Sequence, residues 1–385
     1  MSTTDGNGST NSNGSTNGNG ASHGGLARRA EDRWADDRPV RLGLVGAGRI
    51  ASTYAEILAA STVADVAGVA DPLAEAAERA ASVLGCPAFA SHEELAAAVP
   101  LDAVVICSPP TTHVPIGTWL LERGIAVLCE KPFAVDVESA RALQAAADRN
   151  GTLVTMAAKF RFADDVVKAK HILDSGILGD LIVFENAFTS RVDMANRWNA
   201  DPTLAGGGVL IDNGTHSVDI VRYFLGPIAE VMAVEGKRAQ GLAVEDTARI
   251  FLRSVDGVIG TIDLSWSLDK SLEHYLWIYG SEGEIRVGWR SSEFRQVSNP
   301  SWVSFGSGYD KAAAMGGSVE NFCNAVAGRE SLLITAEDAI ASVAVVERAY
   351  ESMRSEHWVP VSATPAGADQ EDHVVTSTTP PASSG

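Results

Sequence analysis

The sequence predicts an α/β protein: a doubly wound parallel sheet comes first, and an α+β domain with a large, mostly antiparallel open sheet follows. An apolar run, two glycines and a helical pattern stand together near residue 45. Short apolar runs then alternate with helical patterns as far as residue 156, as is typical of parallel sheets. Beyond residue 160, strand-like runs are separated mainly by turns, as is typical of antiparallel sheets.

The chain has 385 residues, enough for two domains at about 150 residues each. Its ends, 1–38 and 361–385, are rich in small and polar residues and are expected to be disordered tails. The change of pattern near residue 160 divides the remainder into domains at 39–160 and 161–360.

The first domain should contain five strands with helices between them. Ser91 and Glu94 form a capping-box pattern, and Asp136 is a suitable helix N-cap. The expected strands are 41–45, 66–70, 103–107, 126–129 and 153–156. The expected helices begin near Ile50, Leu73, His92, Val114 and Val137.

The second domain should combine a long meander with several helices. Its first helix, 164–174, is ended by Ser175 and Gly176. The expected strands are 181–188, 230–234, 247–252, 258–266, 274–279 and 284–287. The later helices are expected at 209–225, 317–326 and 336–354, and the last should pack back on the body.

The glycine motif that follows the first strand predicts a dinucleotide site. Gly46 permits a tight turn, Gly48 lets the backbone approach a pyrophosphate, and Ala51 is small enough for close packing of the helix on the strand. The helix beginning at Arg49 and Ile50 offers free N–H groups to an anion. The alternative is an ordinary tight turn.

Residues at the ends of two further strands extend this site. Asp71 follows the second strand about 20 residues after the glycines, where an acid binds the ribose 2′-hydroxyl. Its charge would repel a 2′-phosphate, which favours NAD over NADP. Alternatively, Asp71 and Pro72 only start a helix. Ser108 and His113 follow the strand at 103–107 and are expected at the cofactor's edge, although His113 could contact nothing there.

Composition excludes several other classes of protein. A net charge of −19 argues against nucleic acid or an anionic membrane as the main partner. The chain has no secretory signal pattern and no apolar run long enough to span a membrane, so we expect a cytoplasmic protein. Its four cysteines form no C-x-x-C pair and are expected to be free thiols.

Glu130 and Lys131 stand at the carboxyl end of the fourth expected strand, where open α/β sheets bind ligands. Lys131 is expected to point into this crevice, above the nicotinamide. Its alternative is a solvated surface lysine. Glu130 either pairs with Lys131 or caps a neighbouring element.

A glycine-rich stretch opens the helix at 209–225. Asp212 and His216 are four residues apart and share a face of that helix, with Asp219 nearby. An imidazole beside a carboxylate suits a general base for an alcohol proton, although a single histidine on a helix is more often structural. Because no third ligand has a suitable spacing, no metal site is predicted.

Three motifs in order, GAGRIA, EKP and GGGVLIDNGTHSVDI, resemble those of the Gfo/Idh/MocA oxidoreductases, and the resemblance extends over about residues 40–354. It implies an NAD(P)-binding Rossmann domain at 39–160 and a substrate and oligomerisation domain at 161–360. It also implies interconversion of hydroxyl and keto groups on sugars or cyclitols, and a homodimer or homotetramer formed through the open sheet.

The same resemblance assigns roles to individual residues. His216 would take the hydroxyl proton, Asp212 would hold and tune the imidazole, and Lys131 would position the substrate oxygen and the nicotinamide. A histidine rather than a tyrosine at position 216 favours the polyol or sugar branch of the family. The expected cofactor contacts are Gly46, Gly48, Arg49, Ile50, Asp71, Ser108, His113, Glu130 and Lys131.

One position departs from the family pattern. Where many members have N-R-R-F, this chain has Lys159-Phe160-Arg161-Phe162, so an ammonium replaces an amide. Lys159 is expected either to contact substrate hydroxyls or a substrate phosphate, or to be solvated at the domain junction. Arg197 and Trp198, with Arg191, are further candidates for the substrate pocket.

We therefore expect an NAD-dependent dehydrogenase that interconverts a secondary alcohol and a ketone on a cyclitol such as inositol, or on a sugar. One alternative is a nucleotide-sugar or sugar-phosphate 3-dehydrogenase or ketoreductase of antibiotic or glycan biosynthesis. Another is a glycosidase-like enzyme that oxidises and re-reduces its substrate with bound NAD. An alternative from another class is a non-catalytic NAD-binding regulator.

Overall fold

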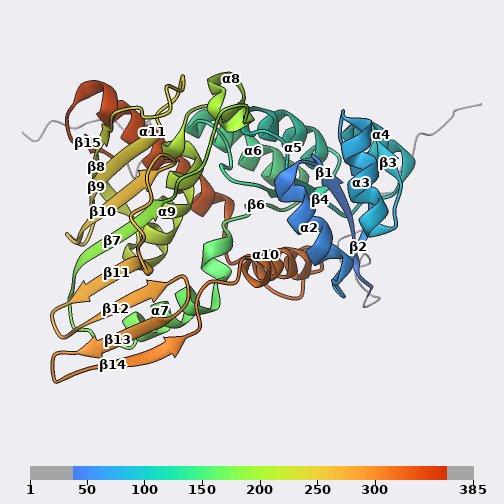
Figure 1. Cartoon of the computed structure of the whole chain (residues 1–385). Helices are drawn as coiled ribbons and strands as arrows, with labels where there is room; N and C mark the ends of the chain where they lie inside the picture. Colours follow the sequence, from blue (N-terminus) through green and yellow to red (C-terminus); the bar gives the residue numbers. More distant parts are fainter. Residues whose placement is uncertain (1–37, 362–385) are drawn as a thin grey trace, which may run out of the picture. The chain divides into compact units, whose positions relative to one another are not determined.

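A computed structural model of the chain describes residues 38–361. The disordered tails expected at 1–38 and 361–385 lie, apart from their innermost residues, outside the described range. Two sheets and the helices around them make up the described part (Figure 1). Within this part, no helix is long and apolar enough to cross a bilayer.

The first sheet has six parallel strands in the order β3-β2-β1-β4-β5-β6. This is the strand order of a Rossmann sheet, and its order reverses between β1 and β4. The carboxyl ends of those two strands therefore flank the crevice in which such sheets bind ligands. The strands are β1 (Val40–Val45), β2 (Ala64–Ala70), β3 (Ala88–Phe89), β4 (Ala103–Ile106), β5 (Ala126–Cys129) and β6 (Val154–Met156).

Helices connect these strands, and two of them have the expected N-caps. Ser91 Oγ accepts the Glu94 N–H at 3.3 Å, and Asp136 Oδ1 accepts the Ser139 N–H at 2.7 Å. A short 3₁₀ turn, Pro110–Thr112, precedes α5. The helices are α2 (Arg49–Ala59), α3 (Ala74–Leu84), α4 (His92–Ala98), α5 (His113–Leu121) and α6 (Val137–Asn150).

The second sheet has nine strands in the order β14-β13-β12-β11-β7-β10-β9-β8-β15. Only β7 and β10 pair in parallel, so the sheet is mostly antiparallel. Buried residues alternate along β9 and β10, because one face of these strands is covered. The strands are β7 (Leu181–Thr189), β8 (Ile228–Glu235), β9 (Thr247–Ser254), β10 (Ile259–Ser265), β11 (His274–Gly280), β12 (Gly283–Gly288), β13 (Ser292–Gln296), β14 (Asn299–Gly306) and β15 (Val359–Pro360).

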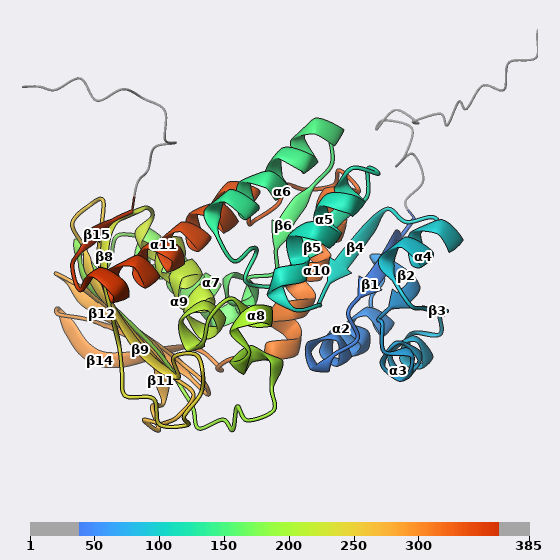
Figure 2. The ribbon, with the colours of Figure 1, turned by 90° about the horizontal axis from the view of Figure 1, so that it is seen from above.

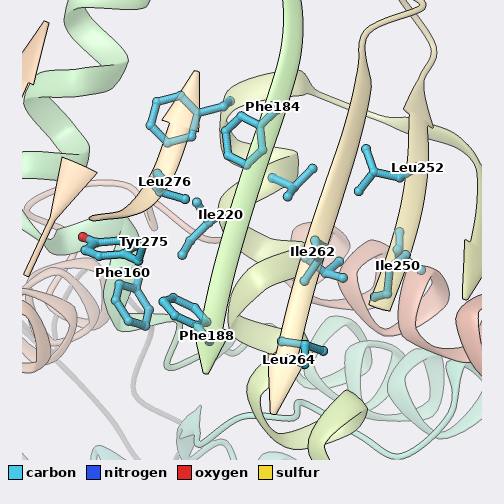
Figure 3. Packing of buried hydrophobic residues seen from close by; sticks show 14 of the residues in the cluster. Phe160, Phe184, Phe188, Ile220, Ile250, Leu252, Ile262, Leu264, Tyr275 and Leu276 are labelled. Atoms are coloured by element: carbon cyan, nitrogen blue, oxygen red, sulfur yellow. The ribbon is translucent and has the colours of Figure 1, made fainter. Parts of the chain in front are cut away.

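Helices α7 (Asp164–Asp174), α9 (Val209–Leu225) and α11 (Ala336–Ser355) contact this sheet and cover it (Figure 2). Figure 3 shows the resulting core, in which Ile220 of α9 belongs to the same cluster as Phe184, Ile262 and Leu276 of the strands. The turn of 3₁₀ helix at Lys159–Phe162 follows β6, and the short helix α8 (Pro202–Ala205) precedes α9.

Some elements differ from the sequence predictions. Helix α10 (Lys311–Val326) begins six residues before the expected start at Gly317, since Asp310 caps it and alanines and Met315 carry the helix up to Gly316 and Gly317. The strands β3, β13, β14 and β15 were not expected. β3 and β15 are only two residues long. In β13 and β14, buried and exposed residues do not alternate, so neither strand has a strong period-2 pattern.

Helix α11 belongs to two hydrophobic cores. Its first half, including Ala339, Ile340 and Val343, packs in the core of the parallel sheet. Its second half, including Val346 and Ala349, packs in the core of the nine-stranded sheet. The helix therefore joins the two sheets. This agrees with the prediction that it packs back on the body of the protein.

Candidate active site

The site is a cavity of about 600 Å³ that residues from both halves of the chain line. The first half contributes the turn after β1 and the ends of β4 and β5, and the second contributes α9 and the segment before α10. The lining residues named in the predictions are Gly48, Arg49, Ile50, Ser108, Glu130, Lys131, Lys159, Trp198, Asp212 and His216.

The glycine turn is shaped for a close backbone approach. Gly46 has φ +89°, and a Cβ there would lie 2.6 Å from Ser108 N, so the turn packs tightly under the end of β4. A Cβ on Gly48 would meet nothing within 4 Å, which leaves open space above the turn. No side chain caps α2, and Gly48, Arg49 and Ile50 at its start line the cavity, so the residues present fit a dinucleotide pyrophosphate.

Asp71 ties the end of β2 to this turn. Its Oδ2 accepts the Ala47 N–H at 2.7 Å, and its Oδ1 accepts the Leu73 N–H at 2.8 Å. Helix α3 begins at Ala74, so Pro72 is not its first residue. The carboxylate thus stands beside the turn with both oxygens oriented by backbone donors.

Glu130 is buried at the end of β5 and anchors the base of the cavity. Its Oε1 accepts the Tyr54 hydroxyl of α2 at 2.8 Å, and its Oε2 accepts the Lys131 N–H at 3.0 Å. It therefore fixes the backbone of Lys131 relative to the helix that carries the glycine turn. Glu130 thus contacts the backbone N–H of Lys131, whereas the Lys131 ammonium pairs with Asp212.

Lys131 and Asp212 join the two halves of the site. The Lys131 ammonium forms an ion pair with the Asp212 carboxylate and donates to the Asp212 carbonyl at 3.1 Å. Both side chains line the cavity. Lys131 is thereby held at the N-terminal end of α9, with the remaining capacity of its ammonium available to a bound molecule.

His216 lies in the wall of the cavity and is 8% exposed. Burial, and then the charges of Lys131 and Lys159, hold the pKa of this imidazole well below its ordinary value. Its ring packs edge-on against Phe160 with 5.3 Å between centroids. Among residues 38–361 neither ring nitrogen has a hydrogen-bond partner, and the Asp212 carboxylate that was expected to hold the imidazole pairs with Lys131 instead.

His113, which was expected at the cofactor's edge, is placed elsewhere. The side chain is 1% exposed and does not line the cavity. Its Nδ1 lies 2.8 Å from the Pro132 carbonyl and its Nε2 lies 2.8 Å from the Ser108 carbonyl. Position 113 begins α5 and faces inward, so the ring connects the loops after β4 and β5 from beneath.

A buried carboxylate holds the start of α9 in place. Glu245 Oε1 accepts the N–H groups of Gly208 and Leu210, each at 3.0 Å, and the Tyr350 hydroxyl at 2.7 Å. Gly208 has to be glycine, because a Cβ there would lie 2.1 Å from the Glu245 carbonyl oxygen. The glycine-rich stretch thus permits close packing rather than forming part of the cavity wall.

A second cavity of about 480 Å³ adjoins the first and shares residues such as Arg49, Asp212 and Asn213 with it. Arg197 lines this second cavity, together with Arg191, whereas Trp198 lines the first. Lys159 lines the first cavity beside His216. The candidate substrate residues are therefore divided between two cavities. We call the first, which His216 lines, the inner cavity and the second the outer cavity.

Several lining residues were not predicted. Trp289 follows β12, Tyr309 lies between β14 and α10, Lys311 begins α10, and Thr53 comes from the second turn of α2. Asp310 as an N-cap was the available signal for Lys311, because it moves the helix start next to that lysine. No local pattern distinguishes Trp289 and Tyr309 from core aromatics.

No group of three or more His, Cys, Asp or Glu side chains in residues 38–361 is close enough to hold a metal ion. All four cysteines are free, and three of them are buried.

Comparison with known proteins identifies both halves of the chain. Residues 40–158 match the description "Oxidoreductase family, NAD-binding Rossmann fold", and residues 166–286 match the GFO/IDH/MocA C-terminal domain. Inositol 2-dehydrogenase of Rhizobium meliloti (strain 1021) is 26% identical over 340 residues, covering 84% of this chain and 99% of that protein. Inositol 2-dehydrogenase 4 of Saccharopolyspora erythraea is 30% identical over 234 residues, covering 59% of this chain and 67% of that protein. A crystal structure of GenD2 from gentamicin A biosynthesis in complex with NAD has a TM-score of 0.75 and 27% identity, covering 86% of this chain and 99% of that one.

Proposed function

The chain belongs to the Gfo/Idh/MocA family of oxidoreductases, and on that premise we propose that it interconverts a secondary alcohol and a ketone on a cyclitol or a sugar with NAD. The observation that carries the proposal is that the glycine turn, Lys131 and His216 line one cavity. A site that only senses NAD has no need of a base and a cation at the same wall. The inositol dehydrogenases among its relatives support the substrate class.

Residues of the first half hold the cofactor in this proposal. Gly48 and the free N–H groups of Arg49 and Ile50 take the pyrophosphate, and Asp71 takes the adenosine ribose. Ser108 and Glu130 line the same cavity further along the sheet. When bound, NAD supplies the acceptor for the hydride that leaves the carbinol carbon.

Residues of the second half manage the proton. His216 is neutral at pH 7 because its pKa lies well below 6.5, so an imidazole nitrogen can accept the substrate's hydroxyl proton. Lys131 donates to the same substrate oxygen and stabilises the charge that develops there. Asp212 holds the Lys131 ammonium in position and offsets its charge.

The assembly proposed here is a homo-oligomer formed through the open face of the nine-stranded sheet. Phe251 is 37% exposed and Ile259 is 52% exposed on that face, beside the ion pair of Arg249 and Asp263. Light scattering on the eluting protein measures the mass directly, and a monomer at micromolar concentration would contradict this part of the proposal.

The decisive experiment combines a substrate panel with a variant pair. Wild-type protein is given NAD with inositols, free sugars, and their uronates and phosphate esters, and the appearance of NADH is followed. His216→Asn should lower kcat by about 10²–10⁴-fold, the usual contribution of a general base, while NAD binding stays near normal. His171→Asn is the matched control, because His171 is exposed on α7. Equal activity of the two variants would remove His216 from the mechanism, and NAD binding without turnover of any substrate would favour a regulator.

The outer cavity favours a second candidate, a nucleotide-sugar or sugar-phosphate dehydrogenase. Arg191 and Arg197 line it, and neither guanidinium has an ion-pair partner among residues 38–361. Two guanidiniums without ion-pair partners in this cavity suit a phosphate that extends from the sugar. NADH formation only with phosphorylated or nucleotide-linked sugars, lost in Arg197→Gln, would support this candidate over the first.

A further inference from the structure

Lys159 lines the inner cavity, and among the described residues its ammonium group has no hydrogen-bond or ion-pair partner. It follows β6, at the start of the 3₁₀ turn Lys159–Phe162, and its side chain is only partly exposed. Its Nζ lies 5.6 Å from the centroid of the Phe160 ring.

The neighbouring charged groups are already engaged. Asp212 pairs with Lys131, and Glu130 accepts from the Tyr54 hydroxyl and the Lys131 N–H. The Lys311 ammonium donates to Thr53 Oγ1 at 3.2 Å, on the side of the glycine turn. No carboxylate of the cavity is therefore left to pair with Lys159.

An ammonium in this position is costly to keep charged. Burial lowers the pKa of Lys159 to about 8; Glu130 and Asp212 oppose that shift, and Lys131 and Lys311 add to it. Aromatic rings make the surroundings poorly polar, with Phe160 stacked on Tyr309 at 4.8 Å between centroids. A charged partner in such surroundings gains more than it would in water.

We propose that the substrate carries an anionic group, a carboxylate or a phosphate ester, close to its reacting hydroxyl, and that Lys159 binds this group. The proposal rests on the proposed function, since it names the substrate class of the same site. A neutral polyol would leave the ammonium with hydroxyl acceptors only, whereas an anion would form a charge-assisted hydrogen bond with it.

The position of Lys159 restricts where the anionic group can be on the substrate. Lys159 and Lys131 are both near enough to His216 to lower the pKa of its imidazole. The anion should therefore stand on the same ring or carbon chain as the reacting carbon. A phosphate at the far end of a nucleotide would instead reach the outer cavity, where Arg191 and Arg197 lie.

Binding of the anion would also assist the base. Its charge would offset that of Lys159, one of the two cations that disfavour the imidazolium form of His216. The imidazole would then accept the hydroxyl proton more readily once the correct substrate is in place. Lys159 is in this respect a specificity residue whose effect reaches the base through the substrate.

The test compares matched pairs of compounds on the full chain. Each neutral sugar or cyclitol is paired with its acid, such as a hexose with the corresponding uronate, and with its phosphate monoester. The measurements are kcat and KM with NAD, and binding of each compound by calorimetry to the NADH complex, which cannot oxidise it. The variants are Lys159→Gln, which removes the charge, Lys159→Arg, which keeps it, and Lys168→Gln, a control on the exposed face of α7.

In the wild type, one anionic class should be preferred over its neutral partner. Lys159→Gln should reduce that preference by about ten- to hundredfold, the usual range for a hydrogen bond to a charged group, mainly through KM. Lys159→Arg should restore part of it, and Lys168→Gln should keep all of it. Preference for the uronates identifies a carboxylate, and preference for the monoesters identifies a phosphate.

Three results would overturn the inference. Neutral compounds could be oxidised as well as their anionic partners, the preference could survive in Lys159→Gln, or Lys159→Gln could weaken both classes equally. Each of these leaves the proposed function intact, because turnover is still seen. If the wild type oxidises neither class, the proposed function itself fails. Thermal unfolding and NAD binding of each variant show whether the folded protein is being compared.

Discussion

His216 shows how one residue connects the site to the pH response of the whole chain. Because its folded-state pKa lies well below 6.5, the native protein keeps it neutral while the unfolded chain protonates it as the pH falls through 6.5. The unfolded state then binds more protons, so the free energy of unfolding decreases with falling pH. The protein therefore has its full stability, as far as His216 is concerned, above pH 6.5, and it loses stability through this residue as the pH falls below 6.5.

We predict that this residue contributes a slope of up to about 1.4 kcal/mol per pH unit below pH 6.5. Urea unfolding at a series of pH values, for wild type and His216→Asn, measures the contribution as the difference between two curves. His113 has a lowered pKa as well, chiefly from burial, but it is present in both proteins and cancels. Parallel curves would show that His216 is protonated in the native state.

Asp71 should decide which dinucleotide is bound. Asp71→Ala removes both the acceptor for the ribose and the charge that repels a 2′-phosphate, so the preference for NAD over NADP should fall by about ten- to hundredfold. Asp71→Asn is the matched variant, because an amide can still accept the Ala47 N–H at the glycine turn. Dissociation constants for both dinucleotides give the ratio. An unchanged ratio in both variants would locate the ribose acid elsewhere.

At the scale of an element, α9 depends on a cap that comes from outside its own sequence. Glu245 satisfies two N–H groups at its start, and Tyr350 of α11 donates to the same carboxylate oxygen. Asp212 and His216 lie within the first turns of this helix, so their positions depend on that cap.

Glu245→Ala leaves buried N–H groups without an acceptor and should lower the free energy of unfolding by about 2–3 kcal/mol, with a loss of turnover. Tyr350→Phe keeps the carboxylate and should cost only about 1 kcal/mol. Chemical denaturation and steady-state kinetics of the two variants compare these effects. Equal losses would mean that the tyrosine, rather than the carboxylate, supports the helix.

Helices and central strands of this chain were predictable because their signals are local. The helix at 209–225 and the strand at 126–129 agree with α9 and β5 in both bounds, since an apolar pattern and its end signals stand side by side in the sequence. The strands β13 and β14 could not be predicted in this way. β13 pairs with β12 and β14 pairs with β13, and few of their side chains are buried.

The candidate site was predictable in its residue types and not in its contacts. Motifs place Lys131, Asp212 and His216 at strand and helix ends, but the ion pair that Lys131 forms with Asp212 crosses 81 positions of sequence. Similarly, the sequence does not show that the Lys159 ammonium has no partner among the described residues, because this depends on how the neighbouring carboxylates pair in the folded chain. Pairing is decided by packing, which a spacing does not describe.

At the scale of the molecule, the two sheets should unfold together. Helix α11 contributes to both cores, and the Thr155 hydroxyl of β6 donates to the Ile334 carbonyl at 2.6 Å just before that helix. A side chain lost from one core therefore weakens a helix on which the other core depends.

We predict one cooperative transition, with coincident curves from tryptophan fluorescence and circular dichroism. Ile340→Ala, in the part of α11 that packs on the parallel sheet, should cost about 2–4 kcal/mol and shift the whole transition without splitting it. Val83→Ala is the control, because Val83 is 57% exposed on α3 and should change little. Two separate transitions in Ile340→Ala would show that the sheets unfold independently.

The place of α11 in the first core also matters during synthesis. A ribosome completes the parallel sheet, from β1 to β6, well before it adds the helix that packs against β6 and α6. Until residues such as Ile340 and Val343 emerge, the apolar side chains of the parallel sheet that they will cover remain exposed to water. A stalled or truncated product would carry this uncovered surface, and it would be a better substrate for chaperones and a more aggregation-prone species than the finished chain.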